Sequence, residues 1–200
     1  NMLNVTLLPV NQCIHPSRMY SLFHEFDGVT PYSRNPLFYE EMSEDSTDVM
    51  LKVDSEIQDI AAVLRNKYNM TDVNIPKIHP MLVSWYDPEL IGDASTLCSY
   101  FRTNQGYAGI DTPMKKVEGG YFPDFNSRYF FEDVPYGLVV TRGIAELIGV
   151  KTPTISMLIQ WAQEKMNKEY LLENDRFEGK DIKDSFAPSA FGFNSPQDLA

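Results

Sequence analysis

The stretch SEDSTDVMLKVDSEIQDIAAVLRNKY, residues 43–68, decides the fold. Its apolar residues recur every three or four positions and so trace one helical face; they are Val49, Val53, Ile57, Ile60, Ala61 and Leu64. Acidic residues crowd its first turns, where they complement the positive end of the helix dipole. We therefore expect one long core helix from about Ser43 to Tyr68.

Upstream of this helix, the sequence predicts a shorter helix between two non-helical segments. After an extended segment through Leu7 and Leu8, apolar residues with helical spacing run from Met19 to Phe26. The following residues to Tyr39 contain one glycine and two prolines, which block helix formation and indicate a long aromatic loop.

Downstream, the pattern is weaker at first. An apolar segment covers residues 78–86, and Asp93 is a candidate N-cap for a helix that runs through Leu97 and Phe101. Residues 106–126 are rich in glycine and proline, so we expect them to be mostly loop.

Two clear helices follow this loop. The first begins near Asp133 and ends at Gly149, which suits the left-handed position after a helix. The second begins with Thr152 as a hydroxyl N-cap and Pro153 in the first helical position, and it runs to about Met166.

These patterns predict a mainly α fold, a single helical domain over residues 1–200 with an initial segment 1–15 and an irregular tail 173–200 that wraps or frays. No internal repeat and no alternation of strands with helices is present. Neither GxGxxG after a strand nor GxxxxGK[ST] occurs, and Gly119-Gly120 stands alone in a predicted loop. We therefore expect no residues for binding a dinucleotide pyrophosphate in the usual way.

Charge and composition exclude several classes of partner. The chain carries 17 basic and 28 acidic residues, a formal net charge of −11, which repels nucleic acid. No apolar run approaches the roughly 20 residues that cross a bilayer, so we expect no membrane span. Cys13 and Cys98 have no zinc or redox spacing, so we expect neither a bound metal nor a disulfide framework. Without a recognisable secretion signal, the cytoplasm is the expected location.

His15, in the segment NQCIHP of residues 11–16, is the first candidate for chemistry. Its imidazole can accept and donate protons near neutral pH, and the expected position before the first helix would present it to a cleft. Taken alone, a His-Pro pair at the start of a helix is more often a hydrogen-bonded structural residue. His24 and His79 lie among apolar positions and are better interpreted as packing or surface residues.

The second candidate is the segment SRYFFEDVPYGL of residues 127–138, where charged residues stand among aromatic ones. In a structural interpretation, Asp133 caps the following helix and Arg128 pairs with Glu132. In a functional interpretation, Arg128 binds a substrate carboxylate through two parallel hydrogen bonds and Asp133 orients a histidine. Composition alone favours the structural interpretation, because helix caps are common and catalytic dyads are rare. Trp85 is by default a core or pocket-wall residue.

An ordered series of segments then resembles the octopine/nopaline dehydrogenase family, specifically its α-helical C-terminal domain. The segments are NQCIHP (11–16), PLFY (36–39), RYFFEDVPYGL (128–138), AELIGVKTPTI (145–155), WAQ (161–163), KEYL (168–171) and GKD (179–181). They span nearly the whole chain in order, which makes the resemblance far more specific than a single His-Pro pair.

The resemblance implies an opine dehydrogenase, which condenses an amino acid with an α-keto acid such as pyruvate and reduces the imine with NAD(P)H. It also implies two domains, with NAD or NADP bound mainly by an N-terminal Rossmann domain that this sequence lacks, so the chain alone is expected to be inactive. By position, His15 and Asp133 match the catalytic pair and Arg128 matches an arginine of the same site. Trp85 and Asn11 are assigned to the substrate pocket.

Those residue types suit the reaction. The amino group must lose a proton before it attacks a carbonyl, and the carbinolamine hydroxyl must gain one before it leaves as water. One imidazole near neutral pH serves both steps, and Asp133 would fix its tautomer. One departure concerns Ser156, because the family often has an acidic residue there.

Two other functions remain open from the sequence. The chain could be the helical domain of another NAD(P)-dependent dehydrogenase acting on hydroxy acids or polyol phosphates, although no Lys/Arg cluster for a phosphate is evident. It could also be a non-catalytic helical module for binding or oligomerisation, in which His15 and Asp133 would have no part in activity.

Overall fold

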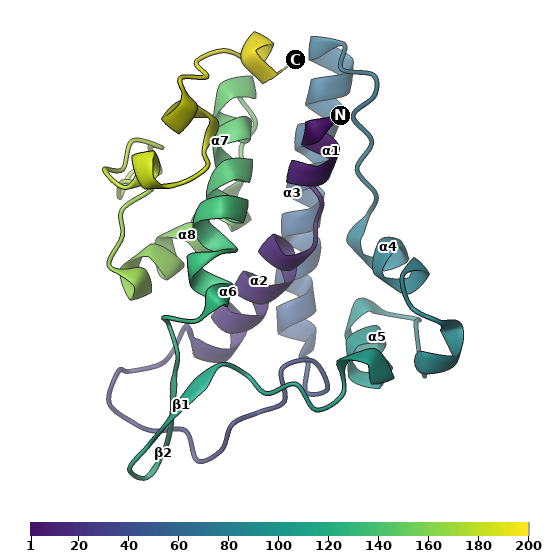
Figure 1. Cartoon of the computed structure of the whole chain (residues 1–200), viewed down its shortest axis with the longest axis vertical. Coiled ribbons are helices and arrows are strands. Elements are labelled where there is room, and N and C mark those ends of the chain that lie inside the picture. Colours follow the sequence, from purple (N-terminus) through teal and green to yellow (C-terminus); the bar gives the residue numbers. More distant parts are fainter. Residues whose placement is uncertain (200) are drawn as a thin grey trace.

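The long helix α3, Glu44–Tyr68, runs along most of the height of the molecule (Figure 1). Its first turn is capped by Ser43, whose hydroxyl accepts a hydrogen bond from the Ser46 amide, and it ends at Asn69 in the left-handed conformation, with φ of 56°. This confirms the expected core helix. The structure is a computed structural model and describes residues 1–199.

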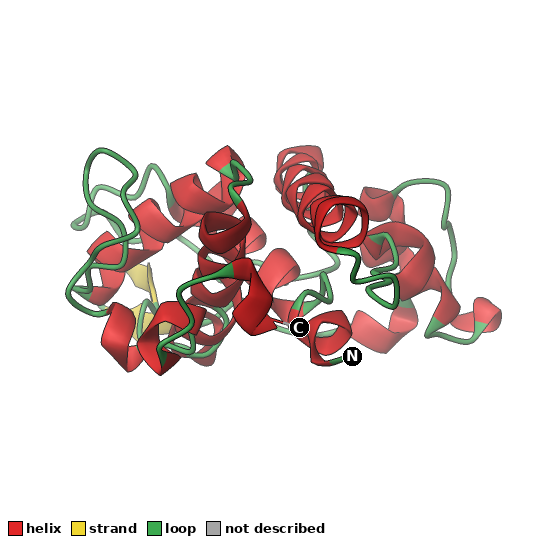
Figure 2. Ribbon diagram, turned by 90° about the horizontal axis from the view of Figure 1, so that it is seen from above, coloured by secondary structure: helices red, strands yellow, loops and turns green. Residues whose placement is uncertain are grey.

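Three further helices pack against α3 and form the core with it: α2 (Asn11–Phe23), α7 (Val139–Ile148) and α8 (Pro153–Met166). Seen from above, helices make up most of the molecule and the strands form one small patch (Figure 2). The mainly α fold is therefore confirmed. Within residues 1–199, no helix is long and apolar enough to cross a membrane.

The beginning of the chain corrects the prediction. Residues Met2–Thr6 form the short helix α1, capped by the Asn1 side chain, where we expected an extended segment. Helix α2 begins at Asn11 and contains Pro16, so His15 lies inside a helix and not in a loop before it. Proline lacks one helical hydrogen bond, but the residues around it are almost completely buried, and this burial outweighs the loss.

The middle of the chain contains α4 (Ile78–Ser84) and α5 (Leu97–Thr103), with single 3-10 turns at Pro88–Leu90 and Gln105–Tyr107. The N-cap of α5 is Thr96, which exchanges hydrogen bonds with Ser99 in a capping box. Asp93 was therefore the wrong cap; its carboxylate accepts from the Ser95 amide in the preceding turn.

A two-stranded antiparallel hairpin, β1 (Met114–Val117) and β2 (Gly120–Pro123), occupies the region expected to be mostly loop. Tyr121 exchanges two 2.9 Å backbone hydrogen bonds with Tyr32, so the hairpin holds the long aromatic loop. Gly120 has φ of 152° and lies directly against the Tyr32 carbonyl, where a Cβ atom would collide. Gly120 therefore permits the close pairing that joins the hairpin to the aromatic loop.

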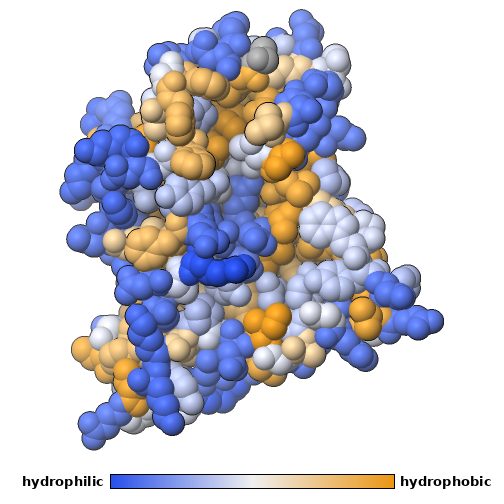
Figure 3. Space-filling model, viewed as in Figure 1, coloured by the Kyte–Doolittle hydropathy of each residue, from blue (hydrophilic) through white to orange (hydrophobic). Residues whose placement is uncertain are grey.

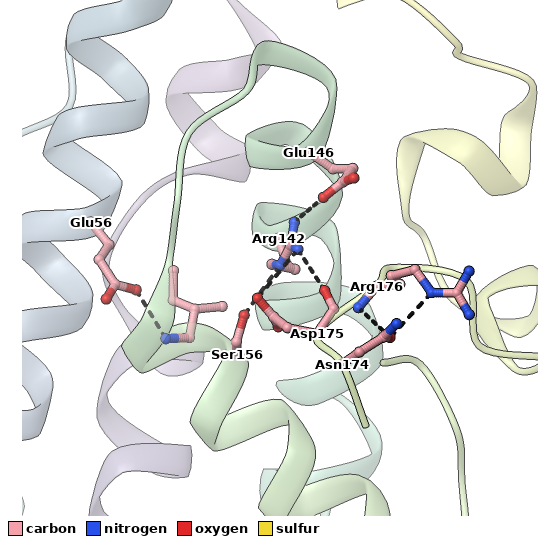
Figure 4. Close-up of polar contacts among 8 residues, drawn as sticks. Glu56, Arg142, Glu146, Ser156, Asn174, Asp175 and Arg176 are labelled. Carbon is pink, nitrogen blue, oxygen red and sulfur yellow. Dashed lines mark hydrogen bonds and ion pairs between the residues drawn. The ribbon is translucent and has the colours of Figure 1, made fainter. Parts of the chain in front are cut away.

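The two late helices are confirmed, with an unexpected connection before them. Helix α6 (Arg128–Phe131) leads into a π-helical turn, η3 (Val134–Leu138), that continues into α7. Helix α8 is capped not by the Thr152 side chain, as expected, but by Glu56 of α3 (Figure 4). Its carboxylate accepts from the Thr154 and Ile155 amides at 2.7 and 2.9 Å.

The C-terminal segment wraps onto the core. It contains the 3-10 turns Ile182–Asp184, Pro188–Phe191 and Pro196–Leu199, and Ala187 is completely buried. Arg142 of α7 anchors this segment by donating to the Asp175 carbonyl, and it also donates to Ser156 and Glu146 (Figure 4). The predicted tail 173–200 thus wraps as far as it is described; Ala200 lies outside the described residues.

Candidate active site

His15 lies in the second turn of α2 and is only 4% exposed. Its ring stacks on Tyr129, with centroids 3.9 Å apart and planes 17° apart, and the edge of Phe38 approaches from another side. Because a buried imidazole needs hydrogen-bond partners for both nitrogens, the identity of those partners decides what it can do.

The first partner is Asp133, at the start of the π-helical turn. Its Oδ2 lies 2.8 Å from His15 Nδ1 across 118 positions of sequence. An ionised carboxylate only accepts hydrogen bonds, so Nδ1 is the protonated nitrogen and the neutral ring keeps its lone pair on Nε2. Asp133 makes no cap hydrogen bond to the helix after it, so the structural interpretation of Asp133 as a cap is wrong.

The second partner, Tyr39, was not singled out from the sequence. Its hydroxyl lies 3.1 Å from Nε2, and the side chain is 7% exposed. Burial raises the pKa of Tyr39 well above its usual value; neighbouring Tyr129, Tyr86 and Asp133 raise it further, while Arg128 acts against them. The only available signal was its place in the PLFY segment, which says nothing about a contact with His15.

The loop that carries Tyr39 is held by Arg18, which is 2% exposed on α2. Its guanidinium donates to the carbonyl oxygens of Phe38 and Glu41 at 3.0 and 2.7 Å and to the Ser46 hydroxyl at 3.1 Å. Burial lowers the pKa of Arg18 to about 10, so the group stays cationic at neutral pH. These bonds fix the backbone on both sides of Tyr39.

Glu41 strengthens the same loop. Its Oε1 accepts from Arg34 at 2.7 Å and from the Leu37 amide at 2.9 Å. The Arg34 hydrogen bond, followed by that of Leu37, lowers the pKa of Glu41 to about 2.

A cleft of about 610 Å³ opens beside Asp133. Asn11 and Glu132 contribute polar groups. Much of the remaining wall is apolar and comes from α1, the connection after it, α7 and the C-terminal segment, including Val5, Leu8, Val140, Phe186 and Phe191. Apolar side chains gather between α1 and the C-terminal segment on the face shown in Figure 3. The site therefore combines a polar end with an apolar wall.

The other predicted site residues stand apart from this hydrogen-bonded chain. Arg128 is exposed, with its guanidinium carbon 6.0 Å from the Tyr129 ring centroid. Among residues 1–199 it forms no ion pair with Glu132, so that predicted pairing is wrong. Trp85 ends α4, is 52% exposed and does not line the cleft beside Asp133, whereas the exposed Asn11 does.

The remaining histidines have local surroundings. His24 is exposed, its Nδ1 lies 3.0 Å from the Tyr20 carbonyl, and its ring stacks on Tyr20. His79 is partly buried. His24 Nε2 lies 4.0 Å from the exposed Glu25 carboxylate, beyond hydrogen-bond distance, whereas His15 has a largely buried carboxylate at 2.8 Å. This difference marks His15 as the acid/base candidate.

The arrangement Asp133–His15–Tyr39 is a chain of three titratable groups. Asp133 accepts from Nδ1 and so fixes the tautomer of the ring, which leaves Nε2, beside the Tyr39 hydroxyl, as the nitrogen that can accept a proton. Such a group suits general acid/base catalysis.

Comparisons with known proteins relate this chain to a family of dehydrogenases. A sequence model of the family described as NAD/NADP octopine/nopaline dehydrogenase, alpha-helical domain, matches residues 1–166. Tauropine dehydrogenase of Arabella iricolor is 41% identical over 197 residues, which are 98% of this chain and 49% of that protein. Octopine dehydrogenase of Pecten maximus is 33% identical over 183 residues, 91% of this chain and 45% of that protein.

Solved structures are similar as well. Octopine dehydrogenase in complex with NADH and agmatine superposes with a TM-score of 0.90 at 31% identity and covers 100% of this chain and 49% of that one. The complex of octopine dehydrogenase with NADH and L-arginine gives a TM-score of 0.88 at 33% identity, over 94% of this chain and 46% of that one. The chain thus spans about half the length of the relatives it matches.

Proposed function

The chain belongs to the octopine/nopaline dehydrogenase family, and from this we propose that it is the helical catalytic domain of an opine dehydrogenase. The proposed reaction joins the amino group of an amino acid to an α-keto acid such as pyruvate and reduces the resulting imine. The observation that carries the proposal is the buried His15–Asp133 pair at 2.8 Å, because it supplies the acid/base group that both halves of the condensation require.

We assign the proton steps to His15. It takes one proton from the substrate ammonium, which frees the nitrogen lone pair, and later returns one to the carbinolamine hydroxyl, which leaves as water. Asp133 stabilises the imidazolium between these steps. Help of this kind contributes about 10²–10⁴-fold in rate.

We assign carboxylate binding to Arg128. Its guanidinium is exposed, beside the Tyr129 ring that stacks on His15, and is free to form a two-pronged hydrogen bond with an α-carboxylate. Asn11 lines the cleft beside Asp133 and is assigned to the substrate, whereas Trp85 is kept as a substrate contact on the strength of the family resemblance alone.

The nicotinamide cofactor does not fit the described residues of this chain. Its role would be to supply the hydride, but the one paired-glycine turn, at Gly119 and Gly120, packs against the Tyr32 backbone and cannot cradle a pyrophosphate. We therefore propose that a nucleotide-binding domain, corresponding to the additional length of the relatives, holds NAD(P)H and closes on this domain, and that the chain alone does not turn over.

The test joins this chain to the nucleotide-binding half of a full-length relative and follows NADH oxidation with pyruvate and a panel of amines that includes taurine, L-arginine and L-alanine. We expect oxidation that depends on an added amine and falls at least about 10²-fold in His15→Ala. The matched control is His24→Ala, which removes an exposed histidine just beyond the same helix and leaves the rate unchanged.

Oxidation that never depends on an added amine would rule out the opine reaction and favour a hydroxy-acid dehydrogenase. Full activity in His15→Ala would favour a helical domain without a catalytic role.

A further inference from the structure

Both ring nitrogens of His15 already have partners within the domain. Nδ1 is 2.8 Å from Asp133 and Nε2 is 3.1 Å from the Tyr39 hydroxyl, and the imidazole is 4% exposed. A substrate amine therefore cannot reach the basic nitrogen of His15 unless Tyr39 moves away or takes part in the proton transfer.

The Tyr39 hydroxyl suits the second of these roles. A phenol both donates and accepts hydrogen bonds, so it can donate to Nε2 of the neutral imidazole and accept from the imidazolium. A backbone carbonyl could serve only the charged form. The position next to Nε2 is thus filled by a group compatible with both states of an acid/base catalyst.

We propose that Tyr39 relays protons between the substrate and His15. This inference rests on the proposed function, because it assigns a further residue to that reaction. In the first step, the substrate ammonium gives a proton to the Tyr39 oxygen while the Tyr39 hydroxyl proton moves to His15 Nε2, leaving a free amine and an imidazolium paired with Asp133.

The return step balances the first. The imidazolium gives its proton back to the Tyr39 oxygen while the Tyr39 hydroxyl proton moves to the carbinolamine hydroxyl. The carbon–oxygen bond then breaks, its electron pair leaves with water, and the nitrogen lone pair forms the carbon–nitrogen double bond. Tyr39 is a neutral phenol before and after each step, which agrees with the burial that disfavours its ionised form.

Neighbouring residues hold the ring and the backbone of Tyr39 in place. Its ring stacks on Tyr107 with centroids 4.3 Å apart, and Arg18 fixes the backbone of the preceding residue, Phe38. Tyr107 and Tyr129, which lie around the Tyr39 and His15 rings, are only partly buried, and exposed Arg128 lies beside Tyr129. A carboxylate bound by Arg128 would bring its substrate to this side of the site.

The main test compares Tyr39→Phe with the native residue in the joined two-domain enzyme described above. Phenylalanine keeps the ring that stacks on Tyr107 and removes only the hydroxyl. We expect kcat to fall roughly 10- to 100-fold while KM changes less than about twofold, because the lost interaction belongs to the proton-transfer step. The control is Tyr20→Phe, which removes a hydroxyl elsewhere on α2, and circular dichroism checks that each variant is folded.

A double variant separates a relay from a structural role. In a His15→Ala background, Tyr39→Phe should cause no further loss, because a relay acts only through the imidazole. Losses that multiply would overturn the relay, as would a Tyr39→Phe enzyme with native kcat.

A solvent-isotope measurement on the joined enzyme without substitutions, here called the native enzyme, gives an independent test. Single-turnover rates measured in mixtures of H₂O and D₂O should depend non-linearly on the deuterium fraction, because two protons move in the same step. A linear dependence would contradict the relay. If the native enzyme shows no amine-dependent oxidation, the proposed function fails and the relay with it. If the native enzyme is active and Tyr39→Phe is equally active, only the relay fails.

Discussion

His15 and Arg18 lie one turn apart on α2 and are 4% and 2% exposed, yet their partners differ in kind. Arg18 donates to two backbone carbonyls and two serine hydroxyls, and none of these four groups gains or loses a proton near neutral pH. His15 lies between a carboxylate and a phenol. The first arrangement stabilises one fixed charge, whereas the second permits a proton to move.

The Arg18 cluster, which is Arg18 with its hydrogen-bond acceptors, and the His15 cluster, which is His15 with Asp133 and Tyr39, both include residues of the loop 38–41. Arg18 fixes the carbonyls of Phe38 and Glu41, and Tyr39 between them faces His15. The structural cation thus places a partner of the titratable residue. We therefore expect substitutions around His15 to lower activity more than stability. Substitutions around Arg18 should lower stability more than activity.

The largest effect is expected from Asp133→Asn. An amide in this position can donate to Nδ1 and so favour the other tautomer, in which Nε2 no longer accepts a proton. We expect kcat of the joined enzyme to fall roughly 10³-fold, about 4 kcal/mol, with little change in the unfolding midpoint. A variant that keeps its activity, or that loses mainly stability, would remove the distinction between the two clusters.

The sequence could supply the helical core because the evidence for it is local. The apolar residues of 43–68, Gly149 and Pro153 each lie within or next to the helix that they indicate, and these three helices formed as predicted, although Glu56 and not Thr152 caps the last of them. The N-terminal error arose because the apolar spacing that indicated the helix begins at Met19, whereas α2 begins at Asn11 and continues through Pro16, whose neighbours are buried.

The site could be predicted only in part for a related reason. The resemblance indicated His15 and Asp133 together, although 118 positions separate them, and the structure brings them into contact. Tyr39 was missed because its position depends on Arg18, on Glu41 and on the hairpin that pairs with Tyr32. Arg18 binds backbone carbonyls, which every sequence contains, so no pattern of residue types indicates the contact.

Arg18→Met tests the structural side of the comparison. It leaves two carbonyls and two serine hydroxyls without the Arg18 donor in a buried site, and we expect a loss of about 3 kcal/mol in the free energy of unfolding, measured with urea. Arg65→Met is the matched control, because Arg65 donates to a single carbonyl, that of Val73, and should lose about 1 kcal/mol. Equal losses would show that the Arg18 cluster has no special structural weight.

Arg142→Met tests whether a second buried arginine contributes to stability as Arg18 does. Arg142 donates to the Ser156 hydroxyl, the exposed Glu146 and the Asp175 carbonyl, so only part of its network is buried (Figure 4). We expect a loss of about 2 kcal/mol in unfolding free energy and faster proteolysis after residue 172, with the His15 cluster intact. Unchanged proteolysis would show that the C-terminal segment is held by its apolar contacts alone.

The smallest effect is expected from Glu41→Gln, which changes the charge of the loop and keeps an acceptor for the Leu37 amide. The pKa of Glu41 is lowered to about 2 in the folded chain by the Arg34 hydrogen bond, so its contribution to stability is present above the ordinary pKa of about 4.5 and is lost as the pH falls towards 2. Arg34 is 67% exposed and Glu41 35%, and solvent screening reduces the expected loss at pH 7 to at most about 1 kcal/mol. Urea unfolding should therefore distinguish Glu41→Gln from the native chain at pH 7 and much less near pH 2, while Glu118→Gln on the hairpin turn changes neither. A difference that persists unchanged at pH 2 would mean that the loop responds to the shape of the side chain and not to its charge.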